Sequence, residues 1–156
     1  MRPSRLLPLI LACALALPAA AQLKKSPSPE GAWSFATNDF RGGCRLAGNI
    51  TLTETKANTF SCSFEANWTC DAGALRSVRT QQSCSATQAG AKVLVTAKLD
   101  KIVSADPADA VTWLKSAYAP DNFDISINMR GDEMSGLFKS YDIAPVKFRR
   151  KAELIS

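Results

Sequence analysis

The sequence predicts a mainly β protein: a small antiparallel barrel or curled sheet of about eight strands, with one short helix and two disulfides. The strongest sign is in residues 59–70, where apolar and polar side chains alternate without a break, as is typical of a half-buried strand. Shorter alternating runs recur on both sides of it. Four cysteines, Cys44, Cys62, Cys70 and Cys84, follow an export signal, so they mature where disulfides form.

The export signal occupies residues 1–21. Arg2 and Arg5 give it a positive start, residues 6–17 form an apolar run, and alanines at 19–21 provide a cleavage site. The run is too short to anchor the chain in a bilayer. Because its richness in alanine and leucine is typical of bacterial signals, we expect a periplasmic or secreted protein.

Cys13 offers an alternative to simple export. It lies inside the apolar run, and residues 10–12 before it loosely resemble a lipoprotein cleavage site. Cleavage there would leave only a short apolar segment before the cysteine. A lipid-anchored form in the outer envelope is therefore the less favoured alternative.

Behind the signal, composition divides the chain into three parts. Residues 22–30 are polar and rich in proline and serine, which indicates a flexible leader. Residues 31–150 carry the alternating pattern and are expected to form one domain, and residues 151–156 are a C-terminal tail. The mature chain has the length of a single domain with one modest core, and we expect a monomer.

One helix is expected to interrupt the strands. Asp106 can cap its amino end, Pro107 suits its first position, and Pro120 ends it. Leu114 and Tyr118 would lie along one face. The other strands are predicted at residues 31–35, 44–52, 77–86, 93–99, 123–129, 134–138 and 144–148.

The strand register selects among the possible disulfide pairings. Cys62 and Cys70 lie on one extended strand, roughly 26 Å apart, so they cannot pair. If short turns join the neighbouring strands, Cys44 faces Cys70 and Cys62 faces Cys84, and apolar residues meet along the ladders. We therefore favour Cys44–Cys70 with Cys62–Cys84. Cys44–Cys62 with Cys70–Cys84 stays open as the alternative.

The distribution of charge argues against nucleic-acid binding. The whole chain has a formal charge of +5, but the basic excess sits in the signal and near the two ends, for example at Lys24 and Arg150. Residues 26–146 hold 11 basic and 13 acidic side chains, so the body has no basic stripe. The basic ends give at most a weak attraction to an anionic membrane surface.

The available side chains also argue against catalysis. The chain has no histidine, which removes His-based triads, the usual base near neutral pH and most zinc or copper sites. Paired cysteines leave no thiolate in the mature chain. No phosphate loop or nucleophile motif is present. We expect no enzyme activity, no catalytic residue, no metal and no cofactor.

The same register indicates a candidate ligand site inside the sheet. Thr80 and Gln82 are polar side chains on an inward face that Phe64 and Trp68 otherwise make apolar. A few polar groups that converge in an apolar concavity are what a small-ligand site needs. The alternative is that both polar side chains are hydrogen-bonded within the core or sit at the open end of the sheet.

Gly31-Ala32-Trp33 in the first strand, with Arg149 and Arg150 at the end of the last, resembles the calycin-type barrels. The resemblance implies that the G-x-W tryptophan packs near the barrel floor and that a basic residue of the final strand stacks across it. Within that group, the amino end is most similar to the small bacterial metalloprotease inhibitors. They too have a short polar leader before G-x-W and a cysteine after it.

In those inhibitors the leader enters the protease cleft. The resemblance would therefore place Gln22, Leu23 and Lys24 in the segment that contacts the protease. Taken together, the sequence predicts a non-catalytic exported binding module of the cell envelope, which binds a small apolar ligand or an envelope protein. A protease inhibitor acting through its leader is the first alternative, and a structural envelope protein is the second.

Overall fold

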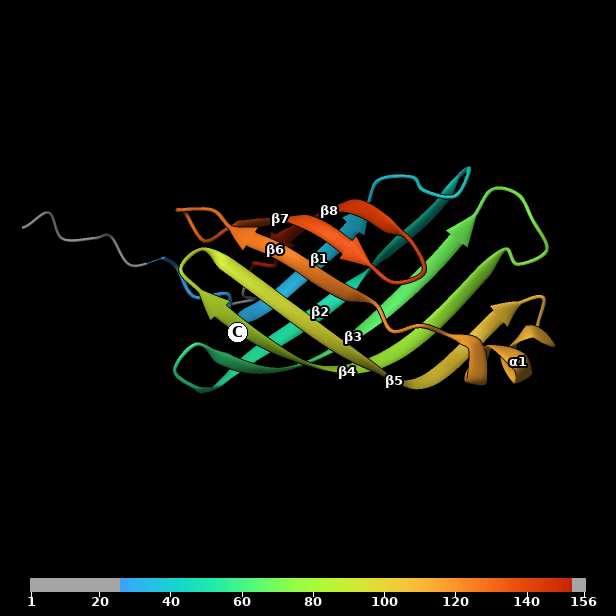
Figure 1. The fold of residues 1–156 in the computed structure, drawn as a ribbon, viewed down its shortest axis with the longest axis horizontal. Helices are drawn as coiled ribbons and strands as arrows, with labels where there is room; N and C mark the ends of the chain where they lie inside the picture. Colours follow the sequence, from blue (N-terminus) through green and yellow to red (C-terminus); the bar gives the residue numbers. More distant parts are fainter. Residues whose placement is uncertain (1–25, 153–156) are drawn as a thin grey trace, which may run out of the picture.

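The computed structural model describes residues 26–152, which form a closed antiparallel barrel (Figure 1). Each strand pairs with the next in sequence, and β8 pairs with β1 to close the barrel. The predicted signal peptide, residues 1–21, lies outside the described residues. The elements are β1 (Gly31–Thr37), β2 (Cys44–Lys56), β3 (Thr59–Cys70), β4 (Ser77–Ala89), β5 (Lys92–Asp106), α1 (Ala110–Ala117), β6 (Asn122–Ile127), β7 (Glu133–Lys139) and β8 (Ile143–Arg150).

The ladders of β2, β3 and β4 confirm the predicted register and the favoured disulfides. Cys44 lies opposite Cys70 and Cys62 lies opposite Cys84, and both pairs are bonded. The partners are 26 and 22 residues apart in sequence. In the chain-entropy model, a disulfide closing a loop of this size stabilises the fold by about 3 kcal/mol.

The strand bounds differ from the prediction at every strand except β3, and the differences at β5 and β6 change the place of a predicted residue. β5 continues past Leu99 to Asp106 and stays paired with β4 to its end, with two register shifts along the ladder. The Asp106 carbonyl accepts a hydrogen bond from the Arg76 N–H at 2.7 Å, so Asp106 belongs to the sheet and does not cap the helix. β6 ends at Ile127, and Met129, which alternation placed in the strand, is 55% exposed in the turn beyond it.

Helix α1 is shorter than predicted. It begins at Ala110, and Pro107, expected at its first position, precedes it in the segment that follows a cis peptide bond. Asp109 occupies the N-cap position without a side-chain hydrogen bond. Leu114 is buried as expected, whereas Tyr118 is half-buried and follows the last helical residue. Within the described residues, no helix is long and apolar enough to cross a membrane.

The ladder between β5 and β6 is the shortest in the barrel. It contains four residue pairs, from Lys92 opposite Ser126 to Val95 opposite Phe123. Beyond it, β5 continues along β4 alone, and α1 packs against β5 at that end (Figure 1). β5 and β6 are therefore joined by strand pairing at one end of the barrel, and at the other end only by the connection that contains α1.

Aromatic side chains fill the barrel interior. The Phe35 ring centroid lies 5.2 Å from those of Phe123 and Phe148 and 5.9 Å from that of Phe64. An eight-stranded barrel can be filled by its own side chains or hold one small ligand. Because the interior of this barrel is filled, a ligand site is expected at an end. The largest fully buried apolar side chains are Trp33, Leu46, Ile50, Leu52, Phe60, Ile125, Phe123, Met134, Phe138 and Phe148.

One end of the barrel, where β1 begins and β8 ends, is closed by Trp33 and Arg150, and we call it the floor. The Arg150 guanidinium lies over the Trp33 ring, 4.3 Å from its centroid. It also donates hydrogen bonds to the carbonyl oxygens of Glu30 and Gly131. The Trp33 Nε1 donates to the Pro29 carbonyl at 2.8 Å. The stacking contact that the calycin resemblance implied is therefore present, and Arg150 makes it.

Replacing Arg150 with alanine is expected to lower the free energy of unfolding by about 1–2 kcal/mol, because the cation–π contact and the charge-assisted hydrogen bonds are lost together. Urea unfolding followed by circular dichroism measures this change. Arg149→Ala is the matched control, and it should change stability by less than about 0.5 kcal/mol because the exposed Arg149 side chain, unlike that of Arg150, makes no hydrogen bond or ion pair among the described residues. Equal effects of the two substitutions would contradict a specific role for Arg150.

Candidate ligand-binding site

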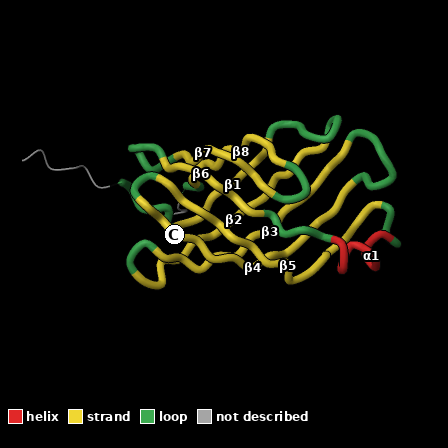
Figure 2. The backbone as a smooth tube through the Cα atoms, viewed as in Figure 1, coloured by secondary structure: helices red, strands yellow, loops and turns green. Residues whose placement is uncertain are grey.

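The candidate site lies at the end of the barrel opposite the floor, which we call the mouth. The connections β1–β2, β3–β4, β5–β6 and β7–β8 meet there, and the β5–β6 connection contains α1 (Figure 2). A pocket of about 240 Å³ opens between these connections. Most of its lining side chains are apolar or aromatic, and the full set is Arg41, Trp68, Leu75, Val78, Trp113, Leu114, Ala117, Tyr118 and Tyr141.

All four connections at the mouth contribute to this pocket. Arg41 comes from β1–β2, Leu75 from β3–β4, Trp113 from α1 and Tyr141 from β7–β8, while Trp68 comes from the barrel wall. The side chains of Trp113 and Tyr141 are 54% and 53% exposed, whereas that of Trp68 is 9% exposed. Exposed aromatic groups gathered around a concavity are typical of a binding site.

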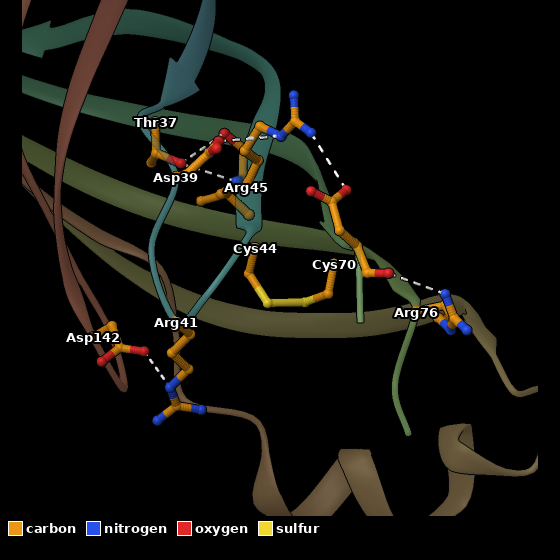
Figure 3. The surroundings of a disulfide bond; sticks show 10 residues. Thr37, Asp39, Arg41, Cys44, Arg45, Cys70, Arg76 and Asp142 are labelled. Carbon is orange, nitrogen blue, oxygen red and sulfur yellow. Dashed lines mark hydrogen bonds and ion pairs between the residues drawn. A yellow bond between two sulfur atoms is a disulfide. The ribbon is translucent and has the colours of Figure 1, made fainter. Parts of the chain in front are cut away.

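An ion pair joins two of the connections at the mouth. The Arg41 guanidinium contacts the Asp142 carboxylate across the β1–β2 and β7–β8 connections (Figure 3). It also lies 5.9 Å from the centroid of the Tyr141 ring. The Cys44–Cys70 disulfide joins β2 to β3 at the same end (Figure 3). Because the ion pair is partly exposed, it adds little stability, but it compensates the one charged side chain of the pocket lining.

A buried polar network lies next to the pocket. The Gln82 Nε2 donates to the Thr80 hydroxyl at 3.1 Å and to the Asp121 carboxylate at 2.5 Å. The Tyr118 hydroxyl donates to the same carboxylate at 2.6 Å, and the Asp121 N–H donates to the Gln82 Oε1 at 3.1 Å. The network therefore ties the residues after α1 to the inner face of β4.

Burial alters the protonation of this network. It raises the pKa of Asp121 to about 6 from an ordinary value of 3.8, although hydrogen bonds from Tyr118 and Gln82 act in the opposite direction. Burial, together with the nearby Asp121 carboxylate, also raises the pKa of Tyr118. Tyr118 thus stays protonated and donates its hydrogen bond to Asp121 throughout the physiological pH range.

The structure places the four predicted ligand-site residues in different surroundings. Trp68 lines the mouth pocket, but Phe64 packs in the core against Phe35. Thr80 and Gln82 are fully buried and hydrogen-bonded, as the alternative interpretation held, and neither lines the mouth pocket. The sequence reasoning missed Asp121. Two inward polar side chains on β4 were the available signal that a polar partner must face them.

The inhibitor alternative depends on residues that the structure does not describe. Gln22, Leu23 and Lys24 lie before Ser26, where the described residues begin. From Ser28 onward the leader is held against the floor, because Arg150 donates hydrogen bonds to the carbonyl oxygens of Ser28 and Glu30. Residues 28–30 and the mouth pocket therefore lie at opposite ends of the barrel.

Larger depressions occur on the outer surface of the barrel, but their linings are polar. One of about 400 Å³ extends over β2, β3, β4 and β5 and includes Glu65, Gln81 and Asp100, and Phe64 and Gln82 border it. Another, of about 410 Å³, lies over β1 and β8. Small-ligand sites are mostly apolar and concave, so the smaller mouth pocket is the better candidate.

Comparisons with known proteins do not assign a family. No family model and no curated protein matches the chain. Among solved structures, a de novo designed fluorescence-activating β-barrel is 16% identical and has a TM-score of 0.44, with 78% of this chain and 93% of that chain covered. At that score the likeness does not bear on ligand or function. The fold and the pocket define the class of this protein as an eight-stranded antiparallel β-barrel with an apolar mouth.

Proposed function

We propose that this protein is a non-catalytic, exported binding module whose mouth pocket takes a small apolar ligand. The observation that carries the proposal is the pocket itself, where apolar and aromatic side chains from all four connections surround about 240 Å³. Ligand sites in β-barrels occur preferentially at their mouths. The rest of the interior is packed with side chains, so the mouth is where the barrel offers room.

The volume of the pocket limits the class of ligand. A dry protein cavity of about 150 Å³ accommodates benzene. The mouth pocket, at about 240 Å³, therefore accommodates one ring with a short substituent. A long acyl chain or a multi-ring molecule would require a larger cavity.

Three features support an exported, non-catalytic role. The amino end has the composition of a signal peptide, and the two disulfides are consistent with an oxidising compartment. The chain contains no histidine, so the commonest acid–base and metal chemistry has no side chain to use. Binding without chemical change of the ligand is the simplest role consistent with these features.

Native mass spectrometry of the protein, purified from its own cell envelope without reduction, tests the proposal. We expect a co-purifying small molecule that leaves on denaturation. Ala117 lines the pocket, so Ala117→Trp should fill it and reduce the bound fraction at least about tenfold. Ser116→Trp is the matched control, because Ser116 is the preceding residue of α1 and does not line the pocket.

Two outcomes would overturn the proposal. The first is a bare wild-type protein that also fails to bind α-methylstyrene, a single-ring apolar probe, at millimolar concentration. The second is an equal loss of bound molecule in both tryptophan variants, which would place the ligand elsewhere. A bound envelope protein in place of a small molecule would replace the small-ligand assignment with a protein partner.

A further inference from the structure

Trp68 carries a buried hydrogen-bond donor without an acceptor. Among the described residues, three buried side-chain atoms have no hydrogen-bond partner: Trp68 Nε1, Asp121 Oδ1 and Asp142 Oδ2. The two carboxylate oxygens are acceptors, and that of Asp142 contacts the Arg41 guanidinium in an ion pair. The indole nitrogen of Trp68 is thus the one unpartnered donor of the three.

An unpartnered buried donor is unfavourable, because its hydrogen bond to water is lost on folding and is not replaced. The second buried tryptophan shows the usual arrangement, since the Trp33 Nε1 donates to the Pro29 carbonyl at 2.8 Å. Such an exception in a native structure calls for a physical explanation. A ligand that supplies the missing acceptor is the explanation that the position of Trp68 in the pocket lining favours.

The other buried or charged polar groups of the lining are already engaged. The Tyr118 hydroxyl donates to Asp121 at 2.6 Å, and Arg41 is paired with Asp142. The pocket lining therefore presents no unpaired charge to a ligand, and this favours a neutral ligand over an ionic one. The Trp68 N–H is the inner polar group that such a ligand would satisfy.

We infer that the ligand is a neutral, single-ring compound with one hydrogen-bond acceptor, such as a carbonyl oxygen, and that this acceptor binds the Trp68 N–H. The inference rests on the proposed function, because it specifies the ligand of the same pocket. The ring occupies the apolar space between α1 and the barrel. The acceptor points inward to the indole nitrogen.

Entry of the ligand requires a small displacement at the mouth, because the Trp68 nitrogen is covered in the structure. Helix α1 is the element of the pocket lining that we expect to move. It has eight residues, of which only Ala110 and Leu114 are buried, and its N-cap makes no side-chain hydrogen bond. So short a helix depends on its packing for stability. A shift of Leu114 is therefore the expected response to ligand binding.

Two probes of matched shape test the inference. Acetophenone carries a carbonyl oxygen where α-methylstyrene carries a methylene group. In the disulfide-intact wild type, acetophenone should shift the indole N–H resonance of Trp68 downfield, and α-methylstyrene should not. Trp68→Phe should weaken acetophenone binding about tenfold, while the affinity for α-methylstyrene changes less than about twofold.

The control variant is Trp113→Phe, because Trp113 also lines the pocket but has an exposed side chain. It should change the affinities for the two probes by the same factor. The resonance shift in the wild type keeps the test decisive even if Trp68→Phe folds poorly. Binding of both probes without selective loss in Trp68→Phe, or without the resonance shift, overturns the inference and leaves the proposed function standing. Binding of neither probe overturns the inference, and it overturns the proposed function as well when the purified protein carries no small molecule.

Discussion

Replacing Trp33 with alanine is expected to lower the free energy of unfolding by about 3–5 kcal/mol. The Trp33 side chain is 0% exposed, so its removal leaves a cavity at the floor of the barrel. The substitution also removes the hydrogen bond to the Pro29 carbonyl and the ring over which Arg150 lies. The Pro29 backbone in the leader and the Arg150 side chain at the end of β8 would then both lose their contact with the same ring. Urea unfolding followed by far-ultraviolet circular dichroism measures the change.

Two other substitutions give the Trp33 prediction its controls. Trp33→Phe keeps most of the apolar volume but removes the hydrogen bond, so its effect should be smaller than that of alanine. Trp113→Ala removes a side chain that is 54% exposed, so its effect should be about 1 kcal/mol or less. Trp33→Ala with no greater effect than Trp113→Ala would show that the floor contact does not stabilise the barrel.

The protein is expected to become more stable as the pH falls from 7 to 5, through protonation of Asp121. Burial raises the pKa of this carboxyl to about 6 in the folded state, above the ordinary value of 3.8 that the unfolded chain has. Between these values the folded state binds more protons, so stability is greatest at the acidic end and is lost as the pH rises through 6. The difference approaches about 3 kcal/mol in full, of which about 1 kcal/mol falls between pH 7 and pH 5.

Asp121→Asn should abolish this dependence, because the side chain no longer titrates. Asp124→Asn is the control. Asp124 is a partly exposed carboxylate whose pKa is lowered by a hydrogen bond from Lys139, so its stabilising effect is lost only in more acidic solution. Urea unfolding at pH 5 and pH 7 compares the three proteins. A wild type that is equally stable at both values, or an unchanged slope in Asp121→Asn, would contradict the assignment.

The sequence predicts the central part of the sheet well because the register there is overdetermined. An alternating strand that shifts by one residue would turn its whole apolar face to water. In β3 the alternation continues across Phe64 and Trp68, and the same register brings each cysteine opposite its partner. Apolar packing and disulfide geometry therefore both require the same strand register. The disulfide pairing follows from it.

The sequence predicts the region around α1 less well because two local signals compete there. Asp106 and Pro107 form a typical helix start, yet Asp106 remains hydrogen-bonded in the sheet. The long ladder with β4 outweighs the capping preference of one aspartate. Because α1 then begins later and is short, its packing could not be inferred from its own periodicity.

The candidate site was likewise predicted only where its residues lie on strands. Trp68 was identified because strand alternation fixes its side chain on the inner face, and it lines the pocket. Trp113, Tyr141 and Arg41 come from connections, and no periodicity predicts which connections meet in space. Thr80 and Gln82 were correctly placed inside the barrel, but their partner Asp121 lies 39 residues beyond Gln82 in sequence.

The two disulfides cross-link one side of the barrel and leave the other without a covalent link among the described residues. Both bonds lie within β2, β3 and β4, which are also joined by long ladders. The short β5–β6 ladder lies on the other side, next to α1. If the mouth widens on ligand binding, we expect the change between β5 and β6 beside α1, because the disulfides and long ladders restrain the strands on either side of Trp68. For the proposed ligand, β2, β3 and β4 would form the fixed side of the receptor, and the side beside α1 would be the one that adapts to the bound molecule.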